Sequence, residues 1–321
     1  MSSLASTPHP HSFRMLTVRG IYLRLAVALM LPLVPAVLRS GPTVVLLVLS
    51  ALGGGLVAEL LVALVSDDAA KSGGIANGRV LYFSLLTAAL VPLETAPAVV
   101  AAAAAAAVLV GLWLPGGPGS YWMHPVLVGI ALVPGLSTVS AADPLAIGSA
   151  DITNQIEASR FFAVLESRFF APLDMSVTPS AVASVTALAG TPPATVTAGL
   201  VVPLLISAMI VWGDDLVPVV LPVVYLTTFA LMADALGGAP YSLVLAGNIP
   251  MIAVIGLADP GLRPRRLGSL VAFGVLAGIL TAVIAVFEGA GIPAIAGLLL
   301  AGAFRPLLDY VADRVPGRHD R

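Results

Sequence analysis

Long apolar runs alternate with short polar stretches along this 321-residue chain. A transmembrane α-helix needs about 20 apolar residues in succession to cross the hydrocarbon core of a bilayer. Runs near that length, and a few shorter ones, are numerous: 21–38, 42–65, 97–114, 195–212, 216–233, 267–287 and 291–304, then the shorter 80–92, 122–135, 177–190 and 243–258. They lack the apolar–polar alternation of membrane barrel strands. The pattern predicts one all-α polytopic membrane domain over residues 1–321, with about ten transmembrane helices.

Composition supports this prediction and narrows the function. Only 10% of the residues are charged and 59% are hydrophobic, whereas soluble domains carry about 25% charged residues. The net charge of −2 gives no reason to expect a nucleic-acid partner. The chain has no cysteine, which excludes iron–sulfur ligation and disulfide bonds by this chain. Its four histidines are scattered along the sequence, so they do not suggest a transition-metal cluster.

Basic residues predict how the chain is oriented, because cytoplasmic segments carry an excess of Lys and Arg. They precede the first run, follow the second, cluster at 263–266 and end the chain. We therefore expect a multi-pass protein of the plasma (inner) membrane with cytoplasmic tails at 1–18 and 309–321. The crossing count then places 136–176 outside the cytoplasm. Residues 150–175 in that loop have an amphipathic pattern, which fits an interfacial helix or a docking surface for a partner.

Two apolar segments are short and interrupted by Pro, Gly or Asn, namely 77–97 and 241–262. Broken helices in corresponding positions of two halves point to an inverted repeat with a binding site between the halves. A full crossing by 243–258 would also leave the basic cluster at 263–266 on the wrong side. We therefore expect 241–262 to be re-entrant. Whether the chain consists of two inverted five-helix repeats stays open at this point, because the self-similarity is weak.

Ionisable residues within apolar runs are costly and are therefore functional candidates, here for an ion pathway. Glu59 lies deep in the run 42–65. It fits either a cation or proton relay, or a hydrogen-bonded contact between helices. Asp259 precedes Pro260 and fits a turn, since Asp-Pro favours turns, or a cation site. Asp309 lies one turn after Arg305, a spacing that predicts a helical ion pair.

A glycine-rich loop, "LPGGPGS", separates two of the runs. Gly116, Gly117 and Gly119 fit either a tight loop between helices or a close approach of backbone to a phosphate or isoalloxazine. Trp113 and Tyr121 flank the loop near predicted span ends. Aromatic residues there usually form an interfacial belt, although they also suit stacking on a flavin.

Several motifs in order along the chain resemble one family. They are the opening "STPHPHSFRMLTVRGIYLRLAVALMLPLVPAVL", Glu59 in "GLVAELLVAL", "LLTAALVPLETAP", "GGPGSYWMHPVLVGIAL", "IGLADPGLRP" and the ending "FRPLLDYVADRVPGRH". Together they resemble the RnfD/NqrB family. RnfD is a membrane component of the Rnf electron-transport complex, and NqrB is its counterpart in the sodium-pumping NADH:quinone reductase. The similarity covers nearly the whole chain.

The resemblance gives a meaning to residues 137–146, which read STVSAADPLA. Members of this family often carry FMN, joined through its phosphate to a Thr in a motif like Ser-Gly-Ala-Thr-Pro-Leu-Ala. In this chain Asp143 stands at the position of the acceptor Thr, and a carboxylate cannot form that phosphoester. Ser137, Thr138 and Ser140 offer nearby hydroxyls outside the expected frame. The resemblance thus implies an FMN or riboflavin site from which the covalent bond, or the flavin itself, has been lost.

The resemblance also implies a function. The chain would be a membrane subunit of an Rnf- or Nqr-type translocase. Such a subunit relays electrons through flavin, and this electron flow is coupled to Na⁺ or H⁺ transport. Such a subunit is not catalytic alone and needs integral and peripheral partner subunits. Loss of the flavin site leaves two alternatives open, a solute channel or transporter on the same scaffold and a non-redox scaffold subunit.

Overall fold

The computed structural model describes residues 17–66, 77–132, 196, 201–213, 218–238, 248–264, 266–288 and 293–314. Every regular element in this part of the chain is a helix, as the apolar pattern predicts. The predicted loop 136–176, the apolar run 177–190 and residues 1–16 and 315–321 of the tails lie outside the described residues.

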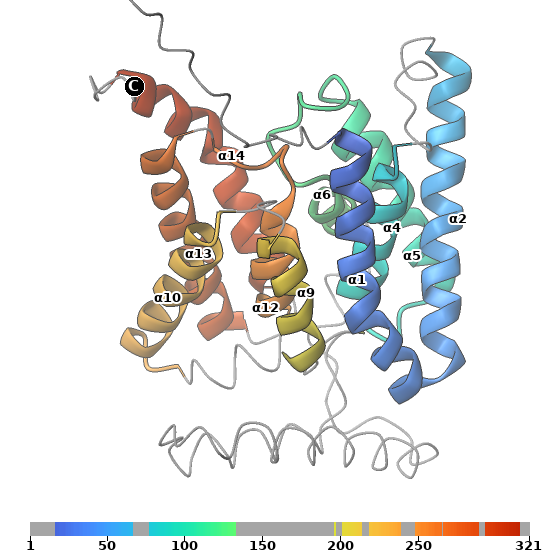
Figure 1. Ribbon diagram of the computed structural model, residues 1–321, viewed down its shortest axis with the longest axis horizontal. Coiled ribbons are helices and arrows are strands. Elements are labelled where there is room, and N and C mark those ends of the chain that lie inside the picture. The colour runs from blue at the N-terminus through green and yellow to red at the C-terminus, as the bar shows by residue number, and fades with distance from the viewer. Residues whose placement is uncertain are drawn as a thin grey trace, which may run out of the picture.

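The helices fall into two successive groups of five segments (Figure 1). The first group comprises α1 (Val18–Ser40), α2 (Pro42–Val65), α4 (Arg79–Leu90), α5 (Pro97–Ala106) continued by the π-helix η1 (Ala107–Trp113), and α6 (Pro125–Leu132). The second comprises α9 (Val201–Gly213), α10 (Val220–Ala235), α12 (Ile249–Val254) followed by the 3₁₀-helix η4 (Gly256–Ala258), α13 (Leu267–Glu288) and α14 (Pro293–Arg314).

Four helices in the described residues are long and apolar enough to cross a membrane, namely α1, α2, α13 and α14. At 1.5 Å per residue their 22 to 24 residues reach roughly 33–36 Å, more than the hydrocarbon thickness of about 30 Å. The other segments are shorter. Helix α14 continues through Arg314, so residues 309–314 of the predicted C-terminal tail are helical.

The short helices α4 and α12 are the middle segments of the two groups and lie against one another in opposite directions. Asn248, just before α12, donates from Nδ2 to the carbonyl of Leu90 at the end of α4 at 3.1 Å. Tyr82, near the start of α4, donates to the carbonyl of Ile255 after α12 at 3.0 Å. Residues 249–258 rise only about 15 Å. The re-entrance of 241–262 stays a prediction, because residues 241–247 lie outside the described part of the chain.

The first helices of the two groups are also antiparallel. Ser207 in α9 donates to the carbonyl of Ala28 in α1 at 2.7 Å, and Arg39 at the end of α1 donates to the carbonyl of Val196 before α9 at 3.0 Å. Packing within the groups repeats as well, because α2 packs on α5 as α10 packs on α13. These relations support the arrangement of two inverted halves that the broken segments suggested.

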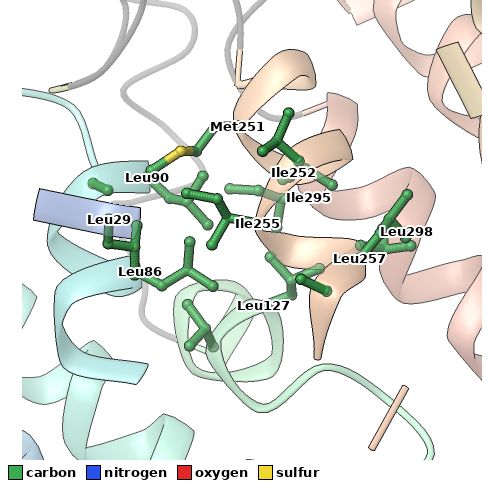
Figure 2. Packing of buried hydrophobic residues seen from close by; sticks show 14 of the residues in the cluster. Leu29, Leu86, Leu90, Leu127, Met251, Ile252, Ile255, Leu257, Ile295 and Leu298 are labelled. Atoms are coloured by element: carbon green, nitrogen blue, oxygen red, sulfur yellow. The ribbon is translucent and has the colours of Figure 1, made fainter. Parts of the chain in front are cut away.

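The core lies where the two halves meet. Figure 2 shows Leu29, Leu86 and Leu127 of the first half facing Ile255 and Leu257, with Leu298 of α14 beyond them. All six side chains are buried. The apolar side chains around α12 and η4 thus hold the two halves together.

Small residues set the distance between α2 and α5. A Cβ atom on Gly54 would lie 2.0 Å from the carbonyl oxygen of Ala101, so only glycine fits there. An apolar groove of about 550 Å³ runs beside this contact and is lined by residues such as Gly53, Gly54 and Ala98. Small residues allow membrane helices to approach closely, and here they make the α2–α5 contact.

Candidate functional site

A buried polar cluster lies between the two halves. We call it the Asp259 cluster; it consists of Tyr22, Tyr121, His124 and Asp259. Tyr22 comes from α1, Tyr121 and His124 from the loop before α6, and Asp259 from the turn after η4. All four residues are at most 4% exposed. Because polar groups are expensive to bury, a cluster of this kind needs internal partners or a function.

One carboxylate oxygen of Asp259 accepts three hydrogen bonds. Its Oδ1 accepts from the hydroxyl of Tyr121 at 2.7 Å, from that of Tyr22 at 3.4 Å and from the backbone N–H of Gly261 at 3.0 Å. The two hydroxyls also lie 3.1 Å apart. The bond from Gly261 closes the turn expected at Asp259. The bonds from the tyrosines go beyond that expectation and join the loop to the other half.

The second carboxylate oxygen of Asp259 faces His124. The Oδ2 atom lies 3.8 Å from Nε2 of His124, and both side chains are fully buried. Neither atom has a hydrogen-bond partner within the described part of the chain.

Two arginines lie beside the cluster. Arg79, the first residue of α4, is 2% exposed, and its charge acts on Tyr22. Arg305 of α14 donates to the carbonyls of Gly261 and Tyr121. Arg305 also forms an ion pair with Asp309 at 3.7 Å, which confirms the predicted helical pair. Both arginines thus act on residues that donate to Asp259, and within the described part of the chain neither forms an ion pair with its carboxylate.

The cluster lies towards one end of the bundle. Figure 1 shows the start of α1, the end of α2, the loop before α6 and the end of α14 at that same end. Apart from the loop before α6, these segments carry or adjoin the basic residues used to predict the cytoplasmic side. The fold thus brings the segments predicted to be cytoplasmic together.

Glu59 has its own partner. It is 3% exposed in α2, and its Oε2 accepts a hydrogen bond from the indole nitrogen of Trp113 at 2.9 Å. Trp113 ends the π-helix η1, an element that is rare and often found at functional sites. The structure thus forms the contact between helices that was one interpretation of Glu59. The ion-pathway role stays a prediction.

The glycine loop forms tight turns. Gly116, Gly117 and Gly119 have φ values of 114°, 86° and 87°, which favour glycine. The N–H groups of Gly116 and Gly117 donate to the carbonyls of Trp113 and Leu112. Because these donors are already used within the loop, the described geometry fits the tight connection between helices better than a phosphate cradle.

The remaining predicted cofactor residues, Ser137, Thr138, Ser140 and Asp143, lie outside the described residues. Sequence reasoning placed Tyr121 in an interfacial belt, whereas its side chain is 2% exposed in the Asp259 cluster. It also gave no role to Tyr22 and treated His124 only as one of four scattered histidines. The "Tyr-Trp-Met-His-Pro" passage, polar residues at the start of an apolar run, was the available signal for His124 and Tyr121.

The model of a family described as the NQR2, RnfD, RnfE family matches residues 4–317. A search of curated proteins found no significant match.

Proposed function

We propose a function from the premise that this chain belongs to the NQR2, RnfD, RnfE family, whose model covers nearly its whole length. Members of this family are membrane subunits of Rnf- and Nqr-type complexes, and this chain is a helical membrane protein of that kind. The proposed function is ion translocation coupled to electron transfer within such a complex. The Asp259 cluster is the proposed place where this subunit handles the transported ion.

The observation that carries the proposal is the pair of buried atoms that face each other without partners, Oδ2 of Asp259 and Nε2 of His124. Buried ionisable residues in membrane proteins usually mark ion pathways or proton relays. This pair also lies between two antiparallel halves, where alternating access places binding sites in inverted-repeat proteins. A purely structural turn would need only the bond from Gly261 to Oδ1.

We propose that electron transfer takes place within the complex and uses a flavin. This flavin is not joined to the chain by a phosphoester. Asp143 stands where the family motif has its acceptor Thr, and the N–H groups of Gly116 and Gly117 are used within their own loop. We propose that FMN or riboflavin is held non-covalently by this subunit or by a neighbouring one. Integral and peripheral partner subunits supply the electron donor site.

The ion-translocation proposal is tested in membrane vesicles that contain the tagged chain with its native partners. Electron flow is started with NADH or reduced ferredoxin, tried in turn, while ion movement into the vesicles is recorded. Asp259→Asn keeps the size of the side chain and removes its charge. We expect electron flow without ion movement in this variant. The matched control is Asp309→Asn, in the ion pair with Arg305, which should leave ion movement intact.

Ion movement that continues in Asp259→Asn would refute the role of the cluster. Vesicles in which the wild-type chain supports no electron flow with any partner, but which take up a solute, would replace the redox function with the transporter alternative. A chain required only for assembly of the complex would favour the scaffold alternative.

The flavin proposal has a separate test on the denatured chain. In-gel fluorescence should show no flavin on the wild-type protein, because Asp143 offers no acceptor hydroxyl. The variant Ala141→Gly with Asp143→Thr, expressed with a flavin transferase, should become fluorescent. A fluorescent wild-type band that disappears with Ser140→Ala would show that the acceptor is a different residue.

A further inference from the structure

The side chain of His124 caps α6, the last described helix before the segment that resembles the flavin motif. The backbone carbonyl of His124 accepts from the N–H of Val128 at 3.1 Å, and the side-chain Nδ1 accepts from the N–H of Val126 at 3.3 Å. A side-chain acceptor that binds an N–H group of the first turn is the usual arrangement of a helix N-cap. Imidazole is an unusual capping group, and unlike Asn or Ser it can take up a proton.

This cap determines the tautomer of His124. An Nδ1 atom that accepts a hydrogen bond carries no proton, so the single proton of the neutral ring is on Nε2. That proton faces Oδ2 of Asp259, which lies 3.8 Å away. The resting pair is therefore a carboxylate beside a neutral Nε2–H imidazole. The positive end of the α6 dipole also disfavours a charged ring at this position.

The pair has room for one more proton. A proton added to the ring must go on Nδ1, which can then no longer accept from Val126. A proton added to the carboxylate would leave the ring and the cap unchanged. Oδ1 accepts from two hydroxyls and the N–H of Gly261, and these bonds stabilise the carboxylate form and so favour the ring as the place for the proton. Proton uptake by the ring is thus linked to the first turn of α6.

We propose that the His124–Asp259 pair binds a proton, not Na⁺, and that uptake of this proton releases the N-terminal cap of α6. This inference rests on the proposed ion-handling function and names its ion. The proton comes from water at the nearby end of the bundle, and it returns to water when the cap forms again.

The surroundings of the pair favour a proton over Na⁺. A hard cation needs several oxygen ligands with free lone pairs. Among the described residues, the pair instead faces O–H and N–H donors from Tyr22 on α1, Tyr121 and Gly261. The nearby carbonyls of Ile255 and Gly261 each already accept one hydrogen bond, from Tyr82 and from Arg305.

Other charged and titratable groups lie on the elements around the pair. They are Arg79 and Tyr82 on α4, Arg305 and Asp309 on α14 and Arg263 in the same loop as Asp259.

The test follows the ring and the cap directly in the full-length purified chain in lipid nanodiscs. The protein is labelled with ¹⁵N at histidine and valine, and His124 is assigned by the loss of one of four histidine signals in His124→Gln. At high pH we expect His124 to be neutral and protonated on Nε2. As the pH falls, Nδ1 should gain a proton and the amide signal of Val126 should move with the same midpoint. In Asp259→Asn this midpoint should shift.

Replacing choline by Na⁺ at constant pH should leave both signals unchanged. A Na⁺-dependent shift of either signal would overturn the assignment of the proton, and so would a ring protonated on Nδ1 at high pH. Titration of His124 without any change at Val126 would overturn the link to α6.

A variant separates this inference from the proposed function. His124→Asn keeps a strong capping residue before α6 but cannot titrate in this range. The variant should keep wild-type stability, because the cap remains, and it should lose redox-driven ion movement in vesicles. If the role of His124 were purely structural, His124→Asn would keep both the stability and the ion movement of the wild type. If Asp259→Asn stops ion movement and His124→Asn does not, the proton assignment fails while the ion-handling function stands. If neither variant changes it, the function itself fails.

Discussion

The two tyrosines that donate to Asp259 offer a direct test of the cluster's energetics. Tyr121 donates at 2.7 Å to Oδ1, whereas Tyr22 donates to the same atom at 3.4 Å. The change to Phe deletes the same hydroxyl in both cases and leaves the ring in place. Hydrogen bonds to charged groups contribute about 1.5–3 kcal/mol, and those between membrane helices average roughly 0.6 kcal/mol with a maximum near 1.7.

We therefore expect Tyr121→Phe to lower the free energy of unfolding by about 1.5–2 kcal/mol. Tyr22→Phe should lower it by about 0.5 kcal/mol, because the single proton of the Tyr22 hydroxyl is shared between Asp259 at 3.4 Å and Tyr121 at 3.1 Å. The assay is equilibrium unfolding of the purified protein in mixed micelles, monitored by tryptophan fluorescence. Unfolding must be shown to be reversible and two-state before free energies are compared.

A double-mutant cycle isolates the charge of Asp259. In an Asp259→Asn background the acceptor is neutral, so Tyr121→Phe should cost about 1 kcal/mol less than in the wild type. Equal costs for the two tyrosines would contradict the geometric argument, because the distances would then not determine the energies. A cost for Tyr121→Phe that does not depend on residue 259 would show that its hydroxyl stabilises another contact.

Three further predictions concern other positions. Trp113→Phe leaves the carboxylate of Glu59 buried without its donor, so it should cost about 1–3 kcal/mol in the same assay, while Glu59→Gln keeps an acceptor and should cost less. Gly54→Val should destabilise the protein strongly, because its Cβ atom would overlap the carbonyl of Ala101; Gly53→Val, with no atom within 4 Å of its Cβ, is the matched control. Stability should fall as the pH drops below about 6.5, because the folded chain loses the bond from Val126 to Nδ1 of His124 on protonation whereas the unfolded chain takes up the proton freely, with a slope of at most about 1.4 kcal/mol per pH unit. Thermal melts at several pH values should lose this component in His124→Gln, and a slope unchanged in that variant would contradict the assignment.

The sequence predicted the helical fold well, because that fold follows from composition and local pattern. A bilayer requires every backbone polar group to be satisfied within the segment, so apolar runs of sufficient length form helices regardless of the rest of the chain. The same reasoning identified the interrupted segments that contain α4 and α12, since Pro92 and Pro250 restrict the backbone locally. The pair of Arg305 and Asp309 was predicted because it needs only helical spacing.

The sequence by itself thus determined that this chain is an all-helical membrane protein with two broken segments, and its resemblance pointed to the family. Only the tertiary structure showed that Tyr22, His124 and Asp259 meet, because they are about 100 to 240 positions apart and no periodicity links them. It also showed the donor of Glu59, Trp113 on another helix. The physical reason is that local pattern fixes which face of a helix is apolar, whereas the pairing of two antiparallel halves fixes which buried polar groups face each other.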